Sequence, residues 1–164
     1  SIMDINELDA IIFDFDGVLT DNRVYVDQDG KESVCCNRSD GLAFEALRKL
    51  KIPTFILSTE PNPVVAARAK KLQIPVLHGI KYKRKALLEL CSQNNFNLKK
   101  IFYIGNDLND YYVMKDCGYS ACPLDSHHFI REIADFTLTS RGGEGVVREL
   151  LEEVLNLNLL EILY

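Results

Sequence analysis

The sequence has little that would suit the chain to a membrane or to nucleic acid. No apolar stretch approaches the roughly 20 residues of a membrane-spanning helix, and no charged-then-apolar secretion signal stands near the start. Basic residues are not in excess, because 19 Lys and Arg stand against 24 Asp and Glu, for a net charge of -5. This balance argues against broad binding to nucleic acids or membranes, but it permits an anionic small molecule wherever a local positive charge reverses the field.

Cysteine usage excludes the common zinc and redox motifs. The five cysteines are odd in number, and no two of them have C-x-x-C spacing. We interpret the adjacent pair Cys35 and Cys36 as one core and one surface thiol. The sequence therefore predicts reduced cysteines and a cytoplasmic location.

Length and patterning favour one α/β domain over residues 1–164. The chain is 47% hydrophobic and 26% charged, which is ordinary for a globular protein and enough for a sizeable core. Short apolar runs alternate with amphipathic segments, which predicts a mostly parallel sheet with right-handed crossovers. The expected strands are 9–15, 53–58, 74–79, 100–104, 120–123 and 136–139, and the expected helices are 40–50, 63–72, 82–94, 108–115, 129–133 and 146–155. Ser39 or Asp40 is expected to cap the first of these helices.

One insertion interrupts this alternation. Apolar and polar residues alternate over 23–35 on both sides of Asp29-Gly30, which is a strong hairpin turn signal. Because an isolated hairpin is marginal in water, we expect it to pack on the domain or to pair with a neighbouring subunit. No insertion is large enough for a separate cap domain. The last residues, 156–164, are conspicuously apolar for a terminus.

The first predicted strand ends in two aspartates, Asp14 and Asp16, followed by Gly17. Residues two apart on a strand point to the same side, so we expect both carboxylates to leave the strand end together. Buried carboxylates repel each other and lose hydration, which favours a cation between them. Closely spaced oxygen ligands suit Mg²⁺. The alternative is an ordinary turn in which the carboxylates serve only as caps.

The segment Asp14-Phe-Asp-Gly-Val-Leu-Thr20 resembles the first motif of the haloacid dehalogenase superfamily, the aspartate-nucleophile phosphatases. The resemblance implies a Rossmann-like three-layer sandwich in which Asp14 attacks phosphorus and Asp16 acts as general acid and base. It also implies Mg²⁺ as the cofactor, bound by Asp14, by the backbone carbonyl of Asp16 and by a residue of a later acidic motif.

Three later segments match the remaining motifs of that superfamily. Ser58 ends a predicted strand and would donate to the phosphate, with Thr59 beside it. Lys83, four residues after Gly79, would neutralise the nucleophile, although Lys81 and Lys85 compete for that role. The segment 105–110 resembles the acidic metal motif, but Asn106 stands where an Asp is usual. An amide oxygen can ligate Mg²⁺ without bringing charge, so metal affinity should fall unless Asp107 or Asp110 compensates.

The likeness extends over essentially the whole chain to one branch of the superfamily. This branch contains the 3-deoxy-D-manno-octulosonate 8-phosphate phosphatases and the phosphatases of nine-carbon 2-keto-3-deoxy acid 9-phosphates. Within it, Glu60, Arg68 and Lys71 resemble the nine-carbon substrate pattern, although they could equally form an exposed helix face. The branch implies a homotetramer in which the hairpins associate and a neighbour covers each active site. It also implies a role in sialic acid or lipopolysaccharide biosynthesis.

Two hypotheses follow. The first is a Mg²⁺-dependent phosphatase of a sugar-acid phosphate, of the nine-carbon sialic-acid-like type or of the eight-carbon type. The second is a weakly active or inactive tetramerising or regulatory domain, because Gly105-Asn106-Asp107 resembles the phosphatase-like domain attached to acylneuraminate cytidylyltransferases. A response-regulator receiver domain also uses an acidic pocket and a lysine, but the paired Asp14 and Asp16 fit it poorly.

Overall fold

A computed structural model describes residues 3–164. Six strands form one central sheet in the order β5-β4-β1-β6-β7-β8, and every neighbouring pair is parallel. This confirms the predicted α/β fold with a parallel sheet. The strands are β1 (Ala10–Phe13), β4 (Thr54–Leu57), β5 (Val76–Leu77), β6 (Ile101–Ile104), β7 (Tyr119–Cys122) and β8 (Phe136–Thr137).

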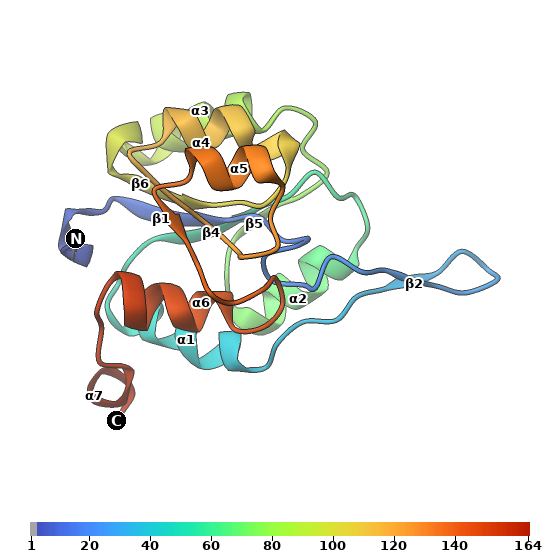
Figure 1. Cartoon of the computed structure of the whole chain (residues 1–164), viewed down its shortest axis with the longest axis horizontal. Helices are drawn as coiled ribbons and strands as arrows, with labels where there is room; N and C mark the ends of the chain where they lie inside the picture. The colour runs from blue at the N-terminus through green and yellow to red at the C-terminus, as the bar shows by residue number, and fades with distance from the viewer. Residues whose placement is uncertain (1–2) are drawn as a thin grey trace.

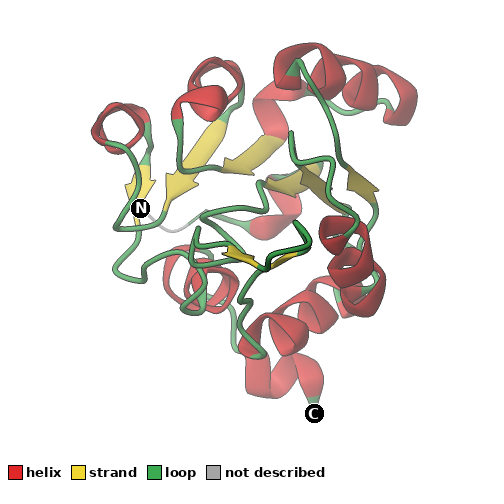
Figure 2. Ribbon diagram, turned by 90° about the vertical axis from the view of Figure 1, so that its right-hand side faces the viewer, coloured by secondary structure: helices red, strands yellow, loops and turns green. Residues whose placement is uncertain are grey.

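The sheet lies between two layers of helices (Figures 1 and 2). On one side lie α3 (Lys83–Asn94), α4 (Tyr111–Asp116) and α5 (His128–Ile133); on the other lie α1 (Ser39–Lys49), α2 (Val64–Leu72) and α6 (Val146–Glu149). Because both faces are covered, the strands carry continuous apolar runs. In β1, Ile11 and Phe13 join the core beneath α1, whereas Ala10 and Ile12 join the core beneath α3. All four are fully buried.

The predicted hairpin is present but short. β2 (Tyr25–Val26) pairs antiparallel with β3 (Glu32–Ser33), and Gly30 turns the chain at a positive φ of 79°. The hairpin projects away from the sandwich (Figure 1). At its base, Asn62 Nδ2 donates to Glu32 Oε2 at 3.2 Å. Within residues 3–164 no other element extends over the sheet as a cap.

The apolar tail contains a helix that the sequence analysis did not predict. α7 (Leu159–Leu163) packs beside α1, where Lys49 Nζ donates to the Leu163 carbonyl at 2.7 Å. Leu159 and Leu163 are each only 8% exposed, so part of the tail's apolar character serves this chain's own core. Leu160, in contrast, is 73% exposed.

Several boundaries differ from those predicted. β1 ends at Phe13, so Asp14 and Asp16 lie just beyond the strand rather than on it. The helix expected at 108–115 begins as the 3₁₀ turn Leu108–Asp110, and the helix expected at 146–155 continues from α6 as the π-helical turn Leu150–Val154. Two further 3₁₀ turns cover Ile5–Glu7 and Leu98–Lys100. Within residues 3–164, no helix is long and apolar enough to cross a membrane.

The start of α1 corrects the predicted cap. Asn37 Oδ1 accepts from the Ser39 backbone N–H at 2.9 Å and from the Ser39 hydroxyl, so neither Ser39 nor Asp40 is the capping side chain. Asp40 is instead buried, with Oδ1 lacking a hydrogen-bond partner among the described residues. Burial raises the pKa of Asp40 to about 7, although Arg68 and Arg148 partly oppose this. All five cysteines are free.

Candidate active site

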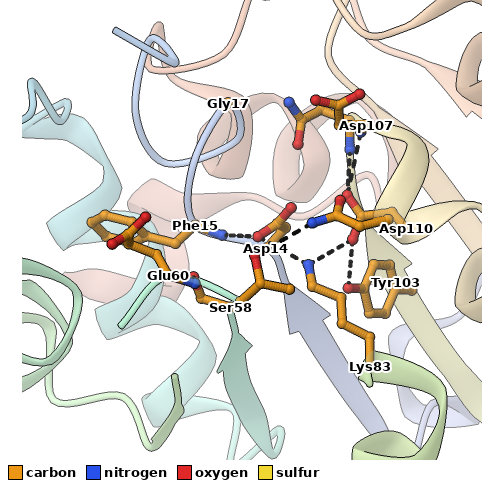
Figure 3. Close-up of polar contacts among 12 residues, drawn as sticks. Asp14, Phe15, Gly17, Ser58, Glu60, Lys83, Tyr103, Asp107 and Asp110 are labelled. Atoms are coloured by element: carbon orange, nitrogen blue, oxygen red, sulfur yellow. Dashed lines mark hydrogen bonds and ion pairs between the residues drawn. The ribbon is translucent and has the colours of Figure 1, made fainter. Parts of the chain in front are cut away.

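The functional side chains gather where three neighbouring strands end. Asp14 follows β1, Ser58 follows β4, and Asn106 follows β6 after Gly105. Since β1 pairs with both β4 and β6 in parallel, the carboxyl ends of these strands meet at one edge of the sheet. Figure 3 shows Asp14 and Ser58 side by side at this edge, with Lys83 approaching from α3.

Asp14 is held rigidly and excluded from water. Its side chain and backbone together are 5% exposed. Its backbone N–H donates to the Ile104 carbonyl at 2.9 Å, which continues the sheet pairing by one residue, and Oδ1 accepts from the Phe15 N–H at 2.7 Å. The position of the carboxylate is therefore set by the strand itself.

Lys83 is the lysine that reaches Asp14. It is the first residue of α3 and is 4% exposed, and its Nζ lies 3.1 Å from Asp14 Oδ1. Lys81 and Lys85, the competing candidates, are exposed to solvent. Of these three lysines, only Lys83 therefore places a positive charge beside the proposed nucleophile.

Asp110 and Tyr103 complete this buried cluster (Figure 3). Asp110 Oδ1 accepts from Lys83 Nζ at 2.7 Å and from the Tyr103 hydroxyl at 2.8 Å. Its Oδ2 accepts from the backbone N–H of Asn106 at 3.0 Å and of Asp107 at 3.3 Å. From the sequence, Asp110 is predicted only as a compensating metal ligand, and no pattern points to Tyr103. Asp107, in contrast, uses its side chain locally, accepting from the Leu108 N–H.

Charge is unequally shared within the cluster. Burial, reinforced by the charge of Asp110, raises the pKa of Asp14 well above its usual value. Burial acts on Asp110 in the same direction, but Lys83 and the surrounding hydrogen bonds prevail and lower the pKa of Asp110. Burial alone would lower the pKa of Lys83, yet the two carboxylates raise it. Lys83 is thus a permanent cation, and additional positive charge beside Asp14 would favour its ionised form.

Asp16 lies at the rim of a cavity of about 190 Å³. Burial and the nearby carboxylate of Glu60 raise the pKa of Asp16. The walls of the cavity come from the loop after β1, the base of the hairpin and the loop after β4. They are formed by Asp16, Asn22, Arg23, Val24, Glu32, Val34, Glu60, Asn62 and Val64.

The loop after β4 joins the phosphate-binding candidates to this cavity. Ser58 is 1% exposed, and its Oγ accepts from the Glu60 N–H at 3.1 Å. Glu60 Oε1 accepts in turn from the Asn62 N–H at 3.0 Å. Thr59 Oγ1 accepts from Asn109 Nδ2 at 3.4 Å, so Thr59 lies between the loops that follow β4 and β6.

Asn106 faces the backbone of the first motif. It is 7% exposed, and a Cβ added to Gly17 would lie 2.6 Å from its Cγ. The inward atom of its amide lies 2.9 Å from the Asp16 carbonyl oxygen and 3.3 Å from Asp14 Oδ2. A carboxylate, a main-chain carbonyl and an amide therefore converge here. No cluster of three or more His, Cys, Asp or Glu side chains arranged to hold a metal occurs in residues 3–164, so any cation at this point would use this mixed set of oxygens.

The structure does not bring Arg68 or Lys71 to the other site residues within this chain. Arg68 Nη2 donates to the Asn37 carbonyl at 3.1 Å, before the start of α1. Lys71 is exposed near the end of α2, about 10 Å along the helix from its first residue at 1.5 Å per residue. Neither lines the cavity beside Asp16.

The glycine-rich loop between β8 and α6 packs against the backbone of the first motif. The Gly143 N–H donates to the Val18 carbonyl at 3.1 Å, and the Gly142 N–H donates to Asp125 Oδ1 at 2.9 Å. A Cβ on Gly142 would lie 2.1 Å from the Gly17 carbonyl oxygen, so the two backbones are in direct contact. The loop therefore limits how far the segment after Asp14 can move.

Comparisons with known proteins agree with this geometry. Residues 50–150 match the model of the haloacid dehalogenase-like hydrolases. The 3-deoxy-D-manno-octulosonate 8-phosphate phosphatase KdsC of Escherichia coli K12 is 30% identical over 146 residues, which cover 88% of this chain and 78% of the relative. N-acylneuraminate cytidylyltransferase A of Danio rerio is 27% identical over 85% of this chain, but the match spans only 33% of that longer protein.

Solved structures give the same assignment. A protein solved as a HAD family hydrolase from Streptomyces avermitilis MA-4680 is 42% identical and superimposes with a TM-score of 0.92, covering 97% of this chain and 91% of that one. The 3-deoxy-D-manno-octulosonate 8-phosphate phosphatase of Moraxella catarrhalis, solved with magnesium, phosphate and KDO, is 29% identical with a TM-score of 0.87, covering 93% and 88% of the two chains. The chain therefore belongs to the haloacid dehalogenase-like hydrolases, in the branch of the 3-deoxy-D-manno-octulosonate 8-phosphate phosphatases.

Proposed function

We propose that the protein hydrolyses the phosphate monoester of a 2-keto-3-deoxy sugar acid, through a phosphoryl group held transiently on Asp14. The observation that carries the proposal is the ion pair between the buried Asp14 and Lys83, 3.1 Å apart, at the end of the central strand. A carboxylate can attack phosphorus and form an acyl phosphate. A fixed ammonium beside it offsets the charge on the equatorial phosphate oxygens.

Asp16 would serve as the acid and then as the base. Its raised pKa suits a carboxyl that gives a proton to the departing sugar alkoxide when the bond from phosphorus to the sugar oxygen breaks. In the second half-reaction Asp16 takes a proton from water as the water oxygen attacks the phosphoryl group. This step frees the Asp14 carboxylate and releases inorganic phosphate.

Ser58 and Thr59 would hold the phosphoryl group. Ser58 Oγ accepts from the Glu60 N–H, which leaves its O–H to donate to a phosphate oxygen. Thr59 lies beside it and is held through Asn109. Together with Lys83 these hydroxyls supply donors from the loop after β4 and from the start of α3, so the phosphoryl group would lie across the ends of the strands.

Mg²⁺ is the proposed cofactor, because the converging groups at Asn106 include three kinds of oxygen that suit it. The residues that would hold it are Asp14, through its carboxylate, Asp16, through its carbonyl, and Asn106, through its amide oxygen. When bound, the ion supplies positive charge that keeps Asp14 ionised and draws charge from the phosphate oxygens.

The sugar would occupy the cavity at Asp16. Its walls carry the carboxylates of Glu32 and Glu60 and the amides of Asn22 and Asn62, which are acceptors and donors for hydroxyl groups. Of the candidate specificity residues Glu60, Arg68 and Lys71, Glu60 lines this cavity and the other two do not. Within a single chain, Glu60 is therefore the residue that would distinguish nine-carbon from eight-carbon acids. Arg68 and Lys71 would act on the substrate only from a different subunit.

Assembly into a homotetramer is part of the proposal. Three consecutive apolar residues of the projecting hairpin are at least half exposed, with Val24 at 50%, Tyr25 at 59% and Val26 at 61%. A second copy of the chain, contributing its own hairpin, would cover them and pair the open strand edges. Such a neighbour would also close the cavity, over which no element of residues 3–164 extends as a cap.

A second candidate function is a tetramerising or regulatory domain without turnover. The observation that favours it is Asn106, which brings no charge to the metal-binding oxygens, together with the 27% identity to N-acylneuraminate cytidylyltransferase A. This candidate predicts the same assembly and the same fold, but no metal-dependent release of phosphate.

The test is phosphate release from a panel of eight-carbon and nine-carbon 2-keto-3-deoxy acid phosphates, with and without Mg²⁺. The proposal expects metal-dependent turnover that Asp14→Asn and Lys83→Gln abolish. Lys81→Gln is the matched control, because Lys81 has the same charge but is exposed two residues away, and it should retain turnover. No release from any substrate would overturn the phosphatase and favour the assembly domain, and release that persists in Asp14→Asn would overturn the proposed role of Asp14.

A further inference from the structure

The side chain of Asn106 can present either its amide oxygen or its NH₂ group to the site, whereas an aspartate would present an oxygen in both orientations. Its inward amide atom has two neighbours within 3.3 Å, the Asp16 carbonyl oxygen and Asp14 Oδ2, and both are hydrogen-bond acceptors. If Oδ1 points inward, three acceptors meet with no donor between them, which requires a cation. If Nδ2 points inward, its two hydrogens satisfy both neighbours at 2.9 and 3.3 Å.

We propose that the Asn106 amide occupies the place of the cation in the metal-free protein, and that Mg²⁺ binds only when this amide turns over. The two states are mutually exclusive, because one and the same atom position is either a donor to Asp14 and Asp16 or a ligand alongside them. In the metal-free state the amide hydrogens take the role that the ion takes in the other state. Mg²⁺ therefore competes with a group of the protein itself.

The backbone of Asn106 and the backbone that its side chain faces are both fixed. The side chain can therefore change state only by rotating its amide group. The Asn106 N–H donates to Asp110 Oδ2 at 3.0 Å, and the Asn106 carbonyl accepts from the His127 N–H at 2.9 Å. Gly17 closes the other side, since its missing Cβ would lie 2.6 Å from Asn106 Cγ. Oδ1 and Nδ2 have almost the same shape, so exchanging them needs no displacement of the surrounding chain.

Two consequences distinguish Asn106 from an aspartate. A carboxylate has no hydrogen to donate, so Asn106→Asp removes the competitor and adds a charged ligand, and both changes strengthen metal binding. Without metal, the same variant places a second carboxylate against Asp14, and the two repel each other. The native chain should thus be the more stable protein without Mg²⁺ and the weaker binder with it.

The first measurement is Mg²⁺ affinity by titration calorimetry, together with thermal unfolding in the presence and absence of a chelator. Asn106→Asp should bind Mg²⁺ more tightly by at least the roughly 10- to 100-fold that changes around metal ligands produce. It should also unfold at a lower temperature than the native chain when chelator is present. Asn109→Asp is the charge-matched control, because it adds the same charge on an exposed side chain of the same loop, and it should change neither property comparably.

The second measurement follows the amide directly. In ¹H–¹⁵N spectra the side-chain NH₂ signals of Asn106 are those that disappear in Asn106→Asp. Their two protons are bound to Asp14 and Asp16 in the metal-free state, so saturating Mg²⁺ should shift both signals as the amide turns away. Zn²⁺ or Ca²⁺ need not be used, because Mg²⁺ alone tests the exchange.

Each outcome decides the proposal without a substrate. Signals of the Asn106 NH₂ group that stay in place while Mg²⁺ saturates the native protein would overturn it, and so would equal Mg²⁺ affinities for the native chain and Asn106→Asp. Mg²⁺ binding that shifts both Asn106 NH₂ signals in the native chain, and that is tighter in Asn106→Asp, would support it. Failure of the phosphatase assay leaves these results unaffected, so the two proposals can fail separately.

Discussion

The ammonium of Lys83 lies closer to Asp110, at 2.7 Å, than to Asp14, at 3.1 Å. Asp110 is itself fixed by the Tyr103 hydroxyl and by the backbone of the loop after β6. The cation that faces the proposed nucleophile is thus positioned by Asp110, a residue to which the proposed mechanism gives no bond-making step. Asp110 is a positioning residue in the proposed mechanism.

Asp110→Asn should lower kcat on the order of 100-fold, because a misplaced ammonium no longer faces the phosphoryl group. KM should change little, since the sugar cavity does not include Asp110. Steady-state kinetics on the best substrate of the panel would separate the two parameters. Tyr103→Phe is the control: it removes one hydrogen bond, worth about 1 kcal/mol, and should leave kcat within a few-fold. Equal losses in both variants would contradict the assignment.

Gly142→Ala should disturb the first motif from a distance. The added Cβ would lie 2.1 Å from the Gly17 carbonyl oxygen, so one backbone must shift, at a cost of about 1–3 kcal/mol by analogy with overpacked cores. Because the displaced segment carries Asp16, kcat should fall together with the free energy of unfolding. Denaturant unfolding and steady-state kinetics measure the two effects.

Gly41→Ala provides the opposite comparison for this prediction. Gly41 lies in the first turns of α1, with no atom within 4 Å of its added Cβ. Alanine should therefore stabilise the helix by about 0.5–1 kcal/mol. If both variants changed the free energy of unfolding in the same direction and by the same amount, close contact with the first motif would not explain the effect at Gly142.

Asp40 gives the protein a dependence on pH that lies outside the active site. Its pKa is raised to about 7 when folded, against about 3.9 when unfolded. As pH rises between these values the unfolded chain gives up its proton first, so the free energy of unfolding falls, and it levels off above about pH 7. Asp40→Asn removes this titration.

The measurement is urea unfolding of the native chain and of Asp40→Asn at about pH 5 and about pH 8. The native chain should lose stability between the two pH values relative to the variant. Asp29→Asn serves as the control, since Asp29 is exposed in the turn of the hairpin. If the free energy of unfolding changed equally with pH in the native chain and in Asp40→Asn, burial would not raise the pKa of Asp40 in the folded protein.

The hairpin should determine oligomeric state. Replacing Val24 and Val26 by Ser removes exposed apolar side chains and should shift the protein to smaller species in light scattering coupled to gel filtration. Gln28→Ser, in the polar turn of the same hairpin, should leave the mass unchanged. A native chain that is already monomeric, or a double variant of unchanged mass, would contradict the proposed assembly.

Sequence reasoning predicted the sheet because the periodic signals are local. Apolar runs such as 10–13 indicate buried parallel strands, and Asp29-Gly30 indicates a hairpin. It also predicted which side chains follow β1, β4 and β6, because parallel strands end at a common edge. Strand ends were placed too late, at residue 15 rather than Phe13 for β1, since an Asp-Phe-Asp segment continues the alternation while the backbone already turns.

The contacts made through long-range packing could not be predicted. Nothing in the local sequence shows that Tyr103, on a buried strand, directs its hydroxyl to Asp110, or that Asp40 is buried rather than capping α1. The helix α7 was missed because five residues give too short a period to recognise. The contact of Gly142 with the first motif joins segments more than a hundred residues apart, so only the folded chain reveals it.

The central position of β1 in the sheet determines when the site can form during synthesis on the ribosome. β1 is synthesised first among the strands, yet its two neighbours are β4 and β6, and the partner that positions Lys83 is Asp110. A ribosome must therefore release about two thirds of the chain before the groups around Asp14 can come together. Until then β1 lacks its β6 neighbour and Lys83 lacks the carboxylate that positions it, so a growing chain should not act on phosphate esters before its sheet has closed.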